Sequence, residues 1–170
     1  MLLMYRNISV LFVLLLVSVF SQPIFATSIT ENEAIDLIVA KLSNGHYGTA
    51  RDNFKALAEQ GNSRAQILLG IMYSEGRGIK RNVPEARVWY QRAAVQGDTQ
   101  AQFLLGLSYI NRYAKFRDHE MAYIWISRAA ESNNLMAQKF MLQTFEQGWL
   151  NMPADKQKVK YWRERLASSQ

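Results

Sequence analysis

Residues 65–70 read Ala65-Gln66-Ile67-Leu68-Leu69-Gly70, and this stretch returns as AQFLLG at residues 101–106. A more divergent copy, AQKFML, occupies residues 137–142, so the interval is 36 residues both times. A fixed period of this size is typical of stacked helical arrays. Each such repeat has one hydrophobic face that only its neighbours can cover, so the repeats form an extended surface suited to holding another molecule. The sequence therefore predicts an all-α solenoid of about four 36-residue helix–turn–helix repeats.

The same period joins many other positions. Trp89 and Trp125 are 36 residues apart, and Tyr161 follows at the same interval. Small residues recur where a neighbouring helix must come close, whereas Leu142 replaces the glycine in the last copy and predicts a different approach there. The residues expected to define the repeat by packing are Ala65, Gly70, Tyr73, Ala86, Trp89, Ala94, Ala101, Gly106, Tyr109, Ala122, Trp125 and Ala130.

Capping signals divide the chain into helices. We expect Thr30 to cap the first helix and Asp118 to cap a helix over residues 119–131. Gly61 is expected to end the helix of residues 46–60, and Pro153 to open the last helix. Ala34 precedes Gly70 by 36 residues and sets the register of the first helix. The predicted repeats span about residues 27–61, 62–97, 98–133 and 134–169, within one domain of residues 27–170.

The N-terminus has a different composition from the rest. Arg6 is the only charged residue before Glu31, and residues 8–20 are apolar apart from two serines. This pattern is typical of a secretory signal peptide over residues 1–26, cleaved after Ala26. The alternative is a membrane anchor, but the apolar run is 13 residues, and a helical span needs about 20. We therefore expect an exported protein, periplasmic or secreted, with no stable membrane span after cleavage.

The composition argues against several kinds of chemistry. The chain has no cysteine, which rules out disulfides and thiolate ligands. Its two histidines, His46 and His119, lie at non-equivalent positions, and a zinc site needs three or four converging ligands. No serine-hydrolase or phosphate-loop motif is present. The formal charge of +6 is mild and does not by itself indicate nucleic acid. We expect no catalytic residue, no cofactor, no metal and no nucleic-acid partner.

The motif residues resemble the Sel-one-like repeat (SLR), a relative of the tetratricopeptide repeat. The resemblance covers about residues 45–165 and is strongest from Ala65 to Gly97. It implies antiparallel helix pairs stacked into a right-handed α/α superhelix, adaptor or scaffold work and no shared catalytic residues. Bacterial proteins of this kind are often exported and regulate envelope processes or host contact. Some cysteine-rich members have been linked to penicillin-like compounds, and the lack of cysteine here weakens that analogy.

The resemblance also indicates where a partner would bind. In the related tetratricopeptide solenoid, the first helix of each pair lines the concave face. Matching the two repeat glycines to that pattern places apolar residues at the centre of the face. These concave-groove residues are Ile67, Ile71, Phe103, Leu107 and Phe140. Two interpretations stay open: the groove binds an amphipathic helix or extended peptide, or a tightly curled coil buries these side chains in its own core.

Basic residues gather in the predicted turns beside this groove. We call them the basic rim: Arg77, Lys80, Arg81, Arg87, Arg112, Lys115 and Arg117. One interpretation is that they attract an acidic partner or anionic envelope polymer, mainly by raising the association rate. The other is that they are solvated loop charges. The leading functional hypothesis is an exported scaffold for protein–protein interaction. The alternatives are a cell-wall or antibiotic-related hydrolase of the same family and a structural subunit of an envelope assembly that self-associates through its fourth repeat.

Overall fold

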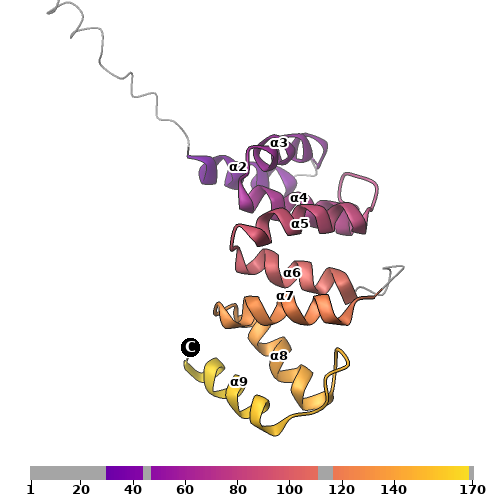
Figure 1. The fold of residues 1–170 in the computed structure, drawn as a ribbon. Coiled ribbons are helices and arrows are strands. Elements are labelled where there is room, and N and C mark those ends of the chain that lie inside the picture. The colour runs from indigo at the N-terminus through magenta and orange to yellow at the C-terminus, as the bar shows by residue number, and fades with distance from the viewer. Residues whose placement is uncertain (1–29, 44–46, 111–116, 169–170) are drawn as a thin grey trace, which may run out of the picture. The chain divides into compact units, whose positions relative to one another are not determined.

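The structure is a computed structural model that describes residues 30–43, 47–110 and 117–168. Within these residues it contains only α-helices, and no strand (Figure 1). They are α2 (Glu31–Ser43), α3 (Tyr47–Glu59), α4 (Ser63–Glu75), α5 (Val83–Val95), α6 (Thr99–Ile110), α7 (His119–Glu131), α8 (Leu135–Gln147) and α9 (Lys156–Ser168). Contacts divide the chain into residues 1–34 and a second unit, Ile35–Gln170. The predicted signal peptide lies outside the described residues.

The first turn of α2 is capped as expected. The backbone N–H of Glu33 donates to the Thr30 hydroxyl oxygen (3.3 Å), and the Glu33 carboxylate accepts from the Thr30 backbone N–H (2.7 Å). This reciprocal capping box satisfies donors that a helix N-terminus would otherwise leave without partners. Thr30 is therefore the N-cap that the sequence predicts.

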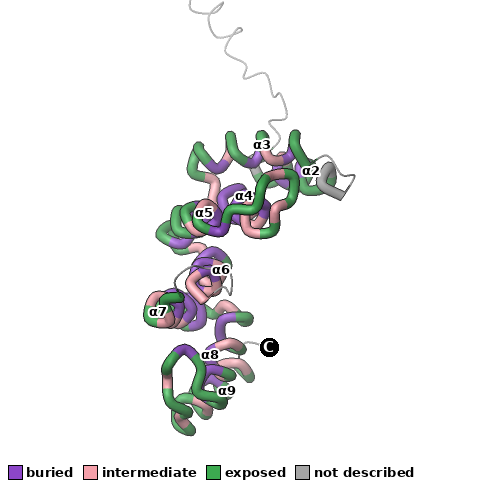
Figure 2. Tube along the Cα trace, turned by 90° about the vertical axis from the view of Figure 1, so that its right-hand side faces the viewer, coloured by how far each residue is buried: buried purple, intermediate pink, exposed green. Residues whose placement is uncertain are grey.

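From α3 onward, each helix packs against the next helix in chain order, as Figures 1 and 2 show for the second unit. The core follows the same order in three clusters. The first joins α2, α3 and α4 around Phe54, the second joins α4 to α7 around Tyr90 and Leu105, and the third joins α7, α8 and α9 around Met141 and Trp162. The interior is thus a series of inter-repeat contacts, as expected for a repeat solenoid.

Each motif helix begins with the same cap. The side chains of Asn62, Asp98 and Asn134 accept a hydrogen bond from the backbone N–H three residues later, at 2.9 Å each time. The residue before each cap has positive φ: Gly61 at 97°, Gly97 at 94° and Asn133 at 64°. Glycine tolerates this left-handed conformation, and asparagine is the usual substitute. The chain therefore turns tightly between repeats and starts the next helix at a fixed place.

The motif glutamine binds one repeat to the one before it. Its side-chain amide donates to a carbonyl in the last turn of the preceding helix, where intrahelical partners run out. The bonds are Gln66 to Ala58 at 2.9 Å, Gln102 to Ala94 at 3.3 Å and Gln138 to Ala130 at 3.2 Å. All three glutamines are buried. A buried carbonyl left unpaired costs about 1–3 kcal/mol, which explains why a polar residue recurs inside the core.

The motif glycines allow close contact within two helix pairs, α4 with α5 and α6 with α7. A Cβ on Gly70 would lie 2.5 Å from the ring of Tyr90 in the next helix. One on Gly106 would collide with the side chain of Ile126 and lie 3.1 Å from the Ala122 carbonyl oxygen. These two positions need glycine because of proximity, and neither has positive φ. Of the predicted packing residues, all are buried except the half-buried Tyr73 and Tyr109.

The first helix is one turn out of the predicted register. α2 begins 32 residues before α4, because only three residues separate Ser43 from α3, whereas seven separate α4 from α5. Ile38 therefore takes the place of Gly70, and Ile35 that of Ile67. Ile35 and Ile38 are 0% and 6% exposed, as this register requires. The alignment of Ala34 with Gly70 is wrong.

The last helix also differs from the prediction. α9 begins at Lys156 and is capped by Asp155, so Pro153 lies in the loop before it. The start is 37 residues after that of α7, which makes Trp162 the counterpart of Trp125. Trp162 is 4% exposed and Tyr161 is 42% exposed. An arginine three residues later lies over the ring in both places, at 4.9 Å for Trp125 and 5.9 Å for Trp162. The alignment of Tyr161 with Trp125 is therefore wrong by one residue.

The close approach at Gly106 is open to a direct test. We expect Gly106→Ala to lower the free energy of unfolding by about 1–3 kcal/mol, because Ile126 and the Ala122 carbonyl must move. Gly48→Ala is the matched control: it makes the same change in α3, where nothing lies within 4 Å of the added Cβ. It should be neutral or stabilising by up to about 1 kcal/mol. Equal urea midpoints for the two variants would refute the packing role of Gly106.

Candidate functional site

The concave-groove residues belong to the first helices of the repeats, and the structure does not expose them equally. Ile67 in α4 is 4% exposed and packs in the cluster of Ala86, Tyr90 and Ala93 from α5. Its side chain is part of the core, so its assignment to an open groove is wrong. The reason is that the motif glycine three residues later draws α5 close to α4 and covers this position.

The other four groove residues are half-buried. Ile71 packs against the α4–α7 cluster, and Phe103, Leu107 and Phe140 pack against the cluster of α7, α8 and α9. They contribute to cohesion between repeats and keep part of their surface accessible. Burial in the core therefore applies fully to Ile67 and partly to these four residues, and binding of a helix or peptide by them stays a prediction.

An aromatic row extends this surface beyond the predicted residues. Phe103 in α6 meets Phe140 in α8 edge-on, with ring centroids 6.2 Å apart. Phe140 in turn meets Trp149, in the loop after α8, at 5.9 Å. We call Phe103, Phe140 and Trp149 the aromatic row. Trp149 is 41% exposed, which is high for a side chain that normally dominates buried contacts.

Sequence reasoning missed Trp149 because the repeat pattern assigns it to a turn. The signal available in the sequence was a tryptophan directly after Gly148, where the corresponding turn of the second repeat carries Arg77. Met136 lies one helical turn before Phe140 and is 60% exposed. Residues four apart on a helix share a face, so Met136 adjoins the row. Together they form an exposed apolar surface on α8 and its following loop.

The residues of the basic rim have different surroundings. Arg77 pairs with Glu75 at 2.5 Å, and Arg81 donates to the backbone carbonyl of Ser74 at 2.8 Å. Lys80 and Arg117 are exposed. Arg112 and Lys115 lie outside the described residues. Exposed ion pairs contribute little to stability, so the exposed rim residues Arg77, Lys80 and Arg117 influence the charge of the surface more than the fold.

Arg87 holds two repeats together. Its guanidinium Nη2 donates to the Ser108 backbone carbonyl at 2.9 Å, and its Nε donates to the Ser108 hydroxyl at 3.3 Å. The same guanidinium lies over the Tyr109 ring, 4.4 Å from its centroid. Arg87 thus joins α5 to α6 and is a structural member of the rim.

Tyr90 in α5 is a buried titratable group. Burial raises its pKa above the ordinary value, a hydrogen bond to Ser74 lowers it, and the charge of Glu75 raises it further. The phenol is therefore neutral at pH 7 and donates to the Ser74 hydroxyl at 3.2 Å. This is the arrangement of a packing residue with a satisfied hydroxyl, and it offers no acid–base function.

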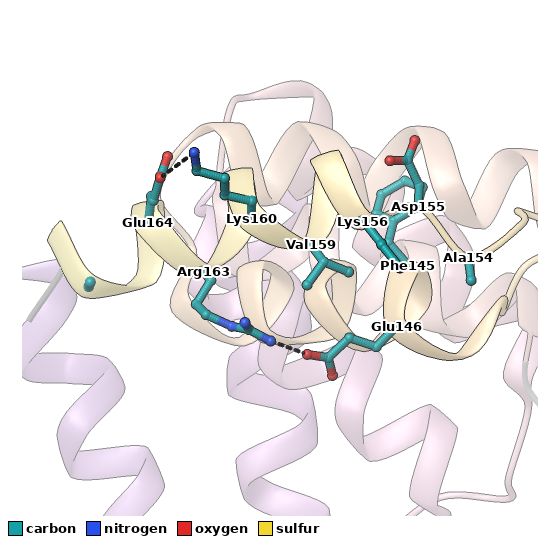
Figure 3. A pocket seen from close by; sticks show the side chains of 10 residues that line it. Phe145, Glu146, Ala154, Asp155, Lys156, Val159, Lys160, Arg163 and Glu164 are labelled. Carbon is teal, nitrogen blue, oxygen red and sulfur yellow. Dashed lines mark hydrogen bonds and ion pairs between the residues drawn. The ribbon is translucent and has the colours of Figure 1, made fainter.

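Two hollows lie away from the aromatic row. A groove of about 740 Å³ runs along the outer side of α8 and α9 (Figure 3). It has Phe145 and Val159 at its base and Lys160, Arg163 and Glu164 along its wall. A more polar hollow of about 550 Å³ is lined by His119 and its neighbours at the start of α7, together with Asn151.

The described parts of the chain hold no group of three or more His, Asp and Glu residues able to bind a metal ion. His46 lies outside the described residues. None of the described helices is long and apolar enough to cross a membrane.

The structural role of Arg87 predicts a stability effect. Arg87→Met should lower the free energy of unfolding by about 1–3 kcal/mol, because the Ser108 carbonyl loses its partner and Tyr109 loses a cation above its ring. Lys80→Met removes one charge from the same rim and should stay within about 0.5 kcal/mol of the parent protein. Guanidinium unfolding curves measure both, and an Arg87→Met curve that coincides with that of Lys80→Met would contradict this role.

Comparisons with known proteins agree with this architecture. Residues 63–98 and 99–134 each match the Sel1 repeat family. The crystal structure of a Sel1 repeat protein from Oxalobacter formigenes superposes with a TM-score of 0.73 at 26% identity, over 85% of this chain and 61% of that one. A protective antigen present in uropathogenic Escherichia coli strains, which displays an SLR fold, has a TM-score of 0.65 at 23% identity.

That second match covers 72% of this chain and 26% of the antigen, so the chain spans less than two thirds of either solved structure. A search of curated proteins finds no match. Two matched repeats at the centre of an all-α repeat solenoid, with solved structures of the same fold, together support a Sel1-like repeat protein.

Proposed function

We propose that this chain is an exported, non-catalytic scaffold that binds a protein partner along the aromatic row and Met136. Sel1 repeats generally mediate protein–protein interaction, and the exposed apolar surface gives that role a location. The observation that carries the proposal is Trp149, which is 41% exposed although one face of it packs on Phe140. Exposed tryptophan and methionine are the residue types most enriched in protein interfaces.

The partner's chemistry follows from the surface. A row of aromatic rings running from α6 across α8 suits the apolar face of an amphipathic helix or an extended peptide. Arg117 is exposed and lines a hollow with Asn151, two residues after Trp149, so it favours an acidic residue at one end of that segment. Such charges act mainly on the association rate, so raising the salt concentration should slow binding more than it speeds release.

Export is the second part of the proposal, and it rests on the apolar segment of residues 8–20 followed by Ala26. When the full chain is expressed in bacterial cells, we expect the product outside the cytoplasm to begin at Thr27. Mass spectrometry of the intact chain measures this. Ala26→Arg places a large charged residue before the cut and should leave the leader attached. A parent chain that stays in the cytoplasm with residues 1–26 intact would contradict export.

Binding at the aromatic row is tested with exposed residues, so that folding is preserved. We expect Met136→Asp/Trp149→Asp to lose at least about tenfold in affinity for a partner recovered from an envelope extract, since truncating an interface tryptophan commonly costs more than 1.4 kcal/mol. Val88→Asp/Val95→Asp is the matched control, because those valines are 43% and 66% exposed on α5. Titration by interferometry, with circular dichroism as a folding check, gives the comparison.

The two possible outcomes decide whether the partner binds at the aromatic row. Loss in the α8 variant with retention in the α5 variant supports the aromatic row as the site. Equal retention in both variants would show that the partner binds elsewhere and would overturn the proposed site.

A further inference from the structure

The second feature of the molecule that points to a partner is the pair of unmatched ends of the repeat stack. In α4, α6 and α8 the fifth motif residue faces the preceding repeat. These residues are Leu69, Leu105 and Met141, and they are 0%, 0% and 1% exposed. In the last case the Met141 sulfur lies 3.7 Å from the Ser127 hydroxyl, and Phe145 from the next turn meets Tyr123 edge-on. Each helix pair therefore forms a packing surface that the following helix covers, and we call this surface a seat.

At the N-terminal end, none of the described helices covers the corresponding side chain. The register of α2 places Leu37 at the position of Leu69 and Leu105. Leu37 is 54% exposed, whereas its counterparts are fully buried. Ile35 and Ile38 of the same helix are buried in the cluster that also contains Phe54, so the helix is anchored while Leu37 stays exposed.

At the C-terminal end, none of the described helices fills the corresponding seat. The groove of Figure 3 lies on α8 and α9, and its lining includes Phe145, Val159 and Ala167. In the register of α9, Lys160 and Glu164 take the places of Tyr123 and Ser127, which contact α8 in the pair before. The groove is therefore the position where a further first helix of a repeat would pack.

The charges of the two ends are complementary. The sequence of α2, ENEAIDLIVAKLS, has three acidic residues and one lysine. Two of the acidic side chains are exposed and have partners within the chain: Asp36 pairs with Arg64 at 2.6 Å, and Glu33 accepts from the Thr30 backbone N–H at 2.7 Å. That of α9, KQKVKYWRERLAS, has five basic residues and one carboxylate. Along the groove wall, Lys160 pairs with Glu164 at 3.9 Å and Arg163 with Glu146 at 2.9 Å. These pairs are exposed and weak, so they can rearrange to meet an incoming acidic helix.

We propose that copies of this chain associate head to tail, with α2 of one copy seated in the groove between α8 and α9 of the next. Leu37 enters the floor formed by Phe145 and Val159, and the carboxylates of α2 face the basic side chains of α9. Because the two faces differ, the contact is heterologous and leaves one free face of each kind, so it continues into longer chains unless a partner blocks an end. This inference is independent of the aromatic row and of the scaffold's external partner.

The first test is the mass of the purified, processed chain as a function of concentration. An interface made by one helix is small, so we expect association over about 10 µM to 1 mM in sedimentation velocity. Leu37→Asp and Lys156→Glu/Lys160→Glu should each abolish it, the first by placing a charge in the groove and the second by repelling α2. Val95→Asp, an equally exposed apolar-to-acid change in α5, should associate like the parent chain.

The second test identifies the direction of the contact. The Leu37→Asp protein keeps an intact groove, and the Lys156→Glu/Lys160→Glu protein keeps an intact α2. Their equimolar mixture should therefore form a dimer that does not grow further, although each variant alone stays monomeric. A symmetric contact between two α2 helices or between two grooves cannot produce this result.

Three results would overturn the proposal. One is a parent chain that stays monomeric at about 1 mM, the upper end of the range expected for so small an interface. Another is a Leu37→Asp variant that associates as strongly as the parent. The last is a mixture of the two variants that remains monomeric. Circular dichroism of each variant excludes loss of folding as the cause, and partner binding at the aromatic row serves as an independent check, since both variants should retain it.

Discussion

The hydrogen bond from the motif glutamine to the preceding helix is the interaction on which the rest of the stack depends. Gln66, Gln102 and Gln138 each pair with a carbonyl that a helix end leaves open, and each is buried in the contact between repeats. Such a bond is favourable in one geometry only, whereas apolar packing tolerates sliding. It therefore sets the angle and spacing at which one repeat follows another, and the surfaces of the molecule follow from that spacing.

The same geometry explains why the surface is divided as it is. Close approach at Gly70 and Gly106 covers the middle of the first helices, which puts Ile67 in the core. Towards the C-terminus, Leu142 of α8 replaces the motif glycine. The helix paired with α8 is α9, and it carries charged residues along the groove. Apolar surface consequently remains accessible at Trp149 and Met136 and in the groove of α8 and α9. The proposed functions use the part of the stack where the repeat departs from its own pattern.

Repeat proteins divide stability and binding between different residues of one unit. In this chain Arg87 belongs to the basic rim by sequence but joins α5 to α6 by its contacts with Ser108 and Tyr109. Phe140 contributes to the core and also supports the exposed Trp149. A residue of this kind cannot be assigned from charge or hydrophobicity alone, because its role depends on which repeat neighbour lies beside it.

The sequence by itself determined the helix type, the period, most helix boundaries and the caps, since these depend on residues within one or two turns. Thr30 and Asp118 act as caps where the local pattern predicts them. The sequence did not determine the register of α2 and α9. The loop after α2 is shorter by four residues and the loop before α9 is longer by one, and such a change shifts a whole helix without changing its composition. The tertiary structure alone decided the burial of Ile67, the aromatic row with Trp149 and the unmatched ends at Leu37 and α9. Each of these depends on contacts between residues of neighbouring repeats, and a periodic sequence shows where such contacts recur but not where they stop.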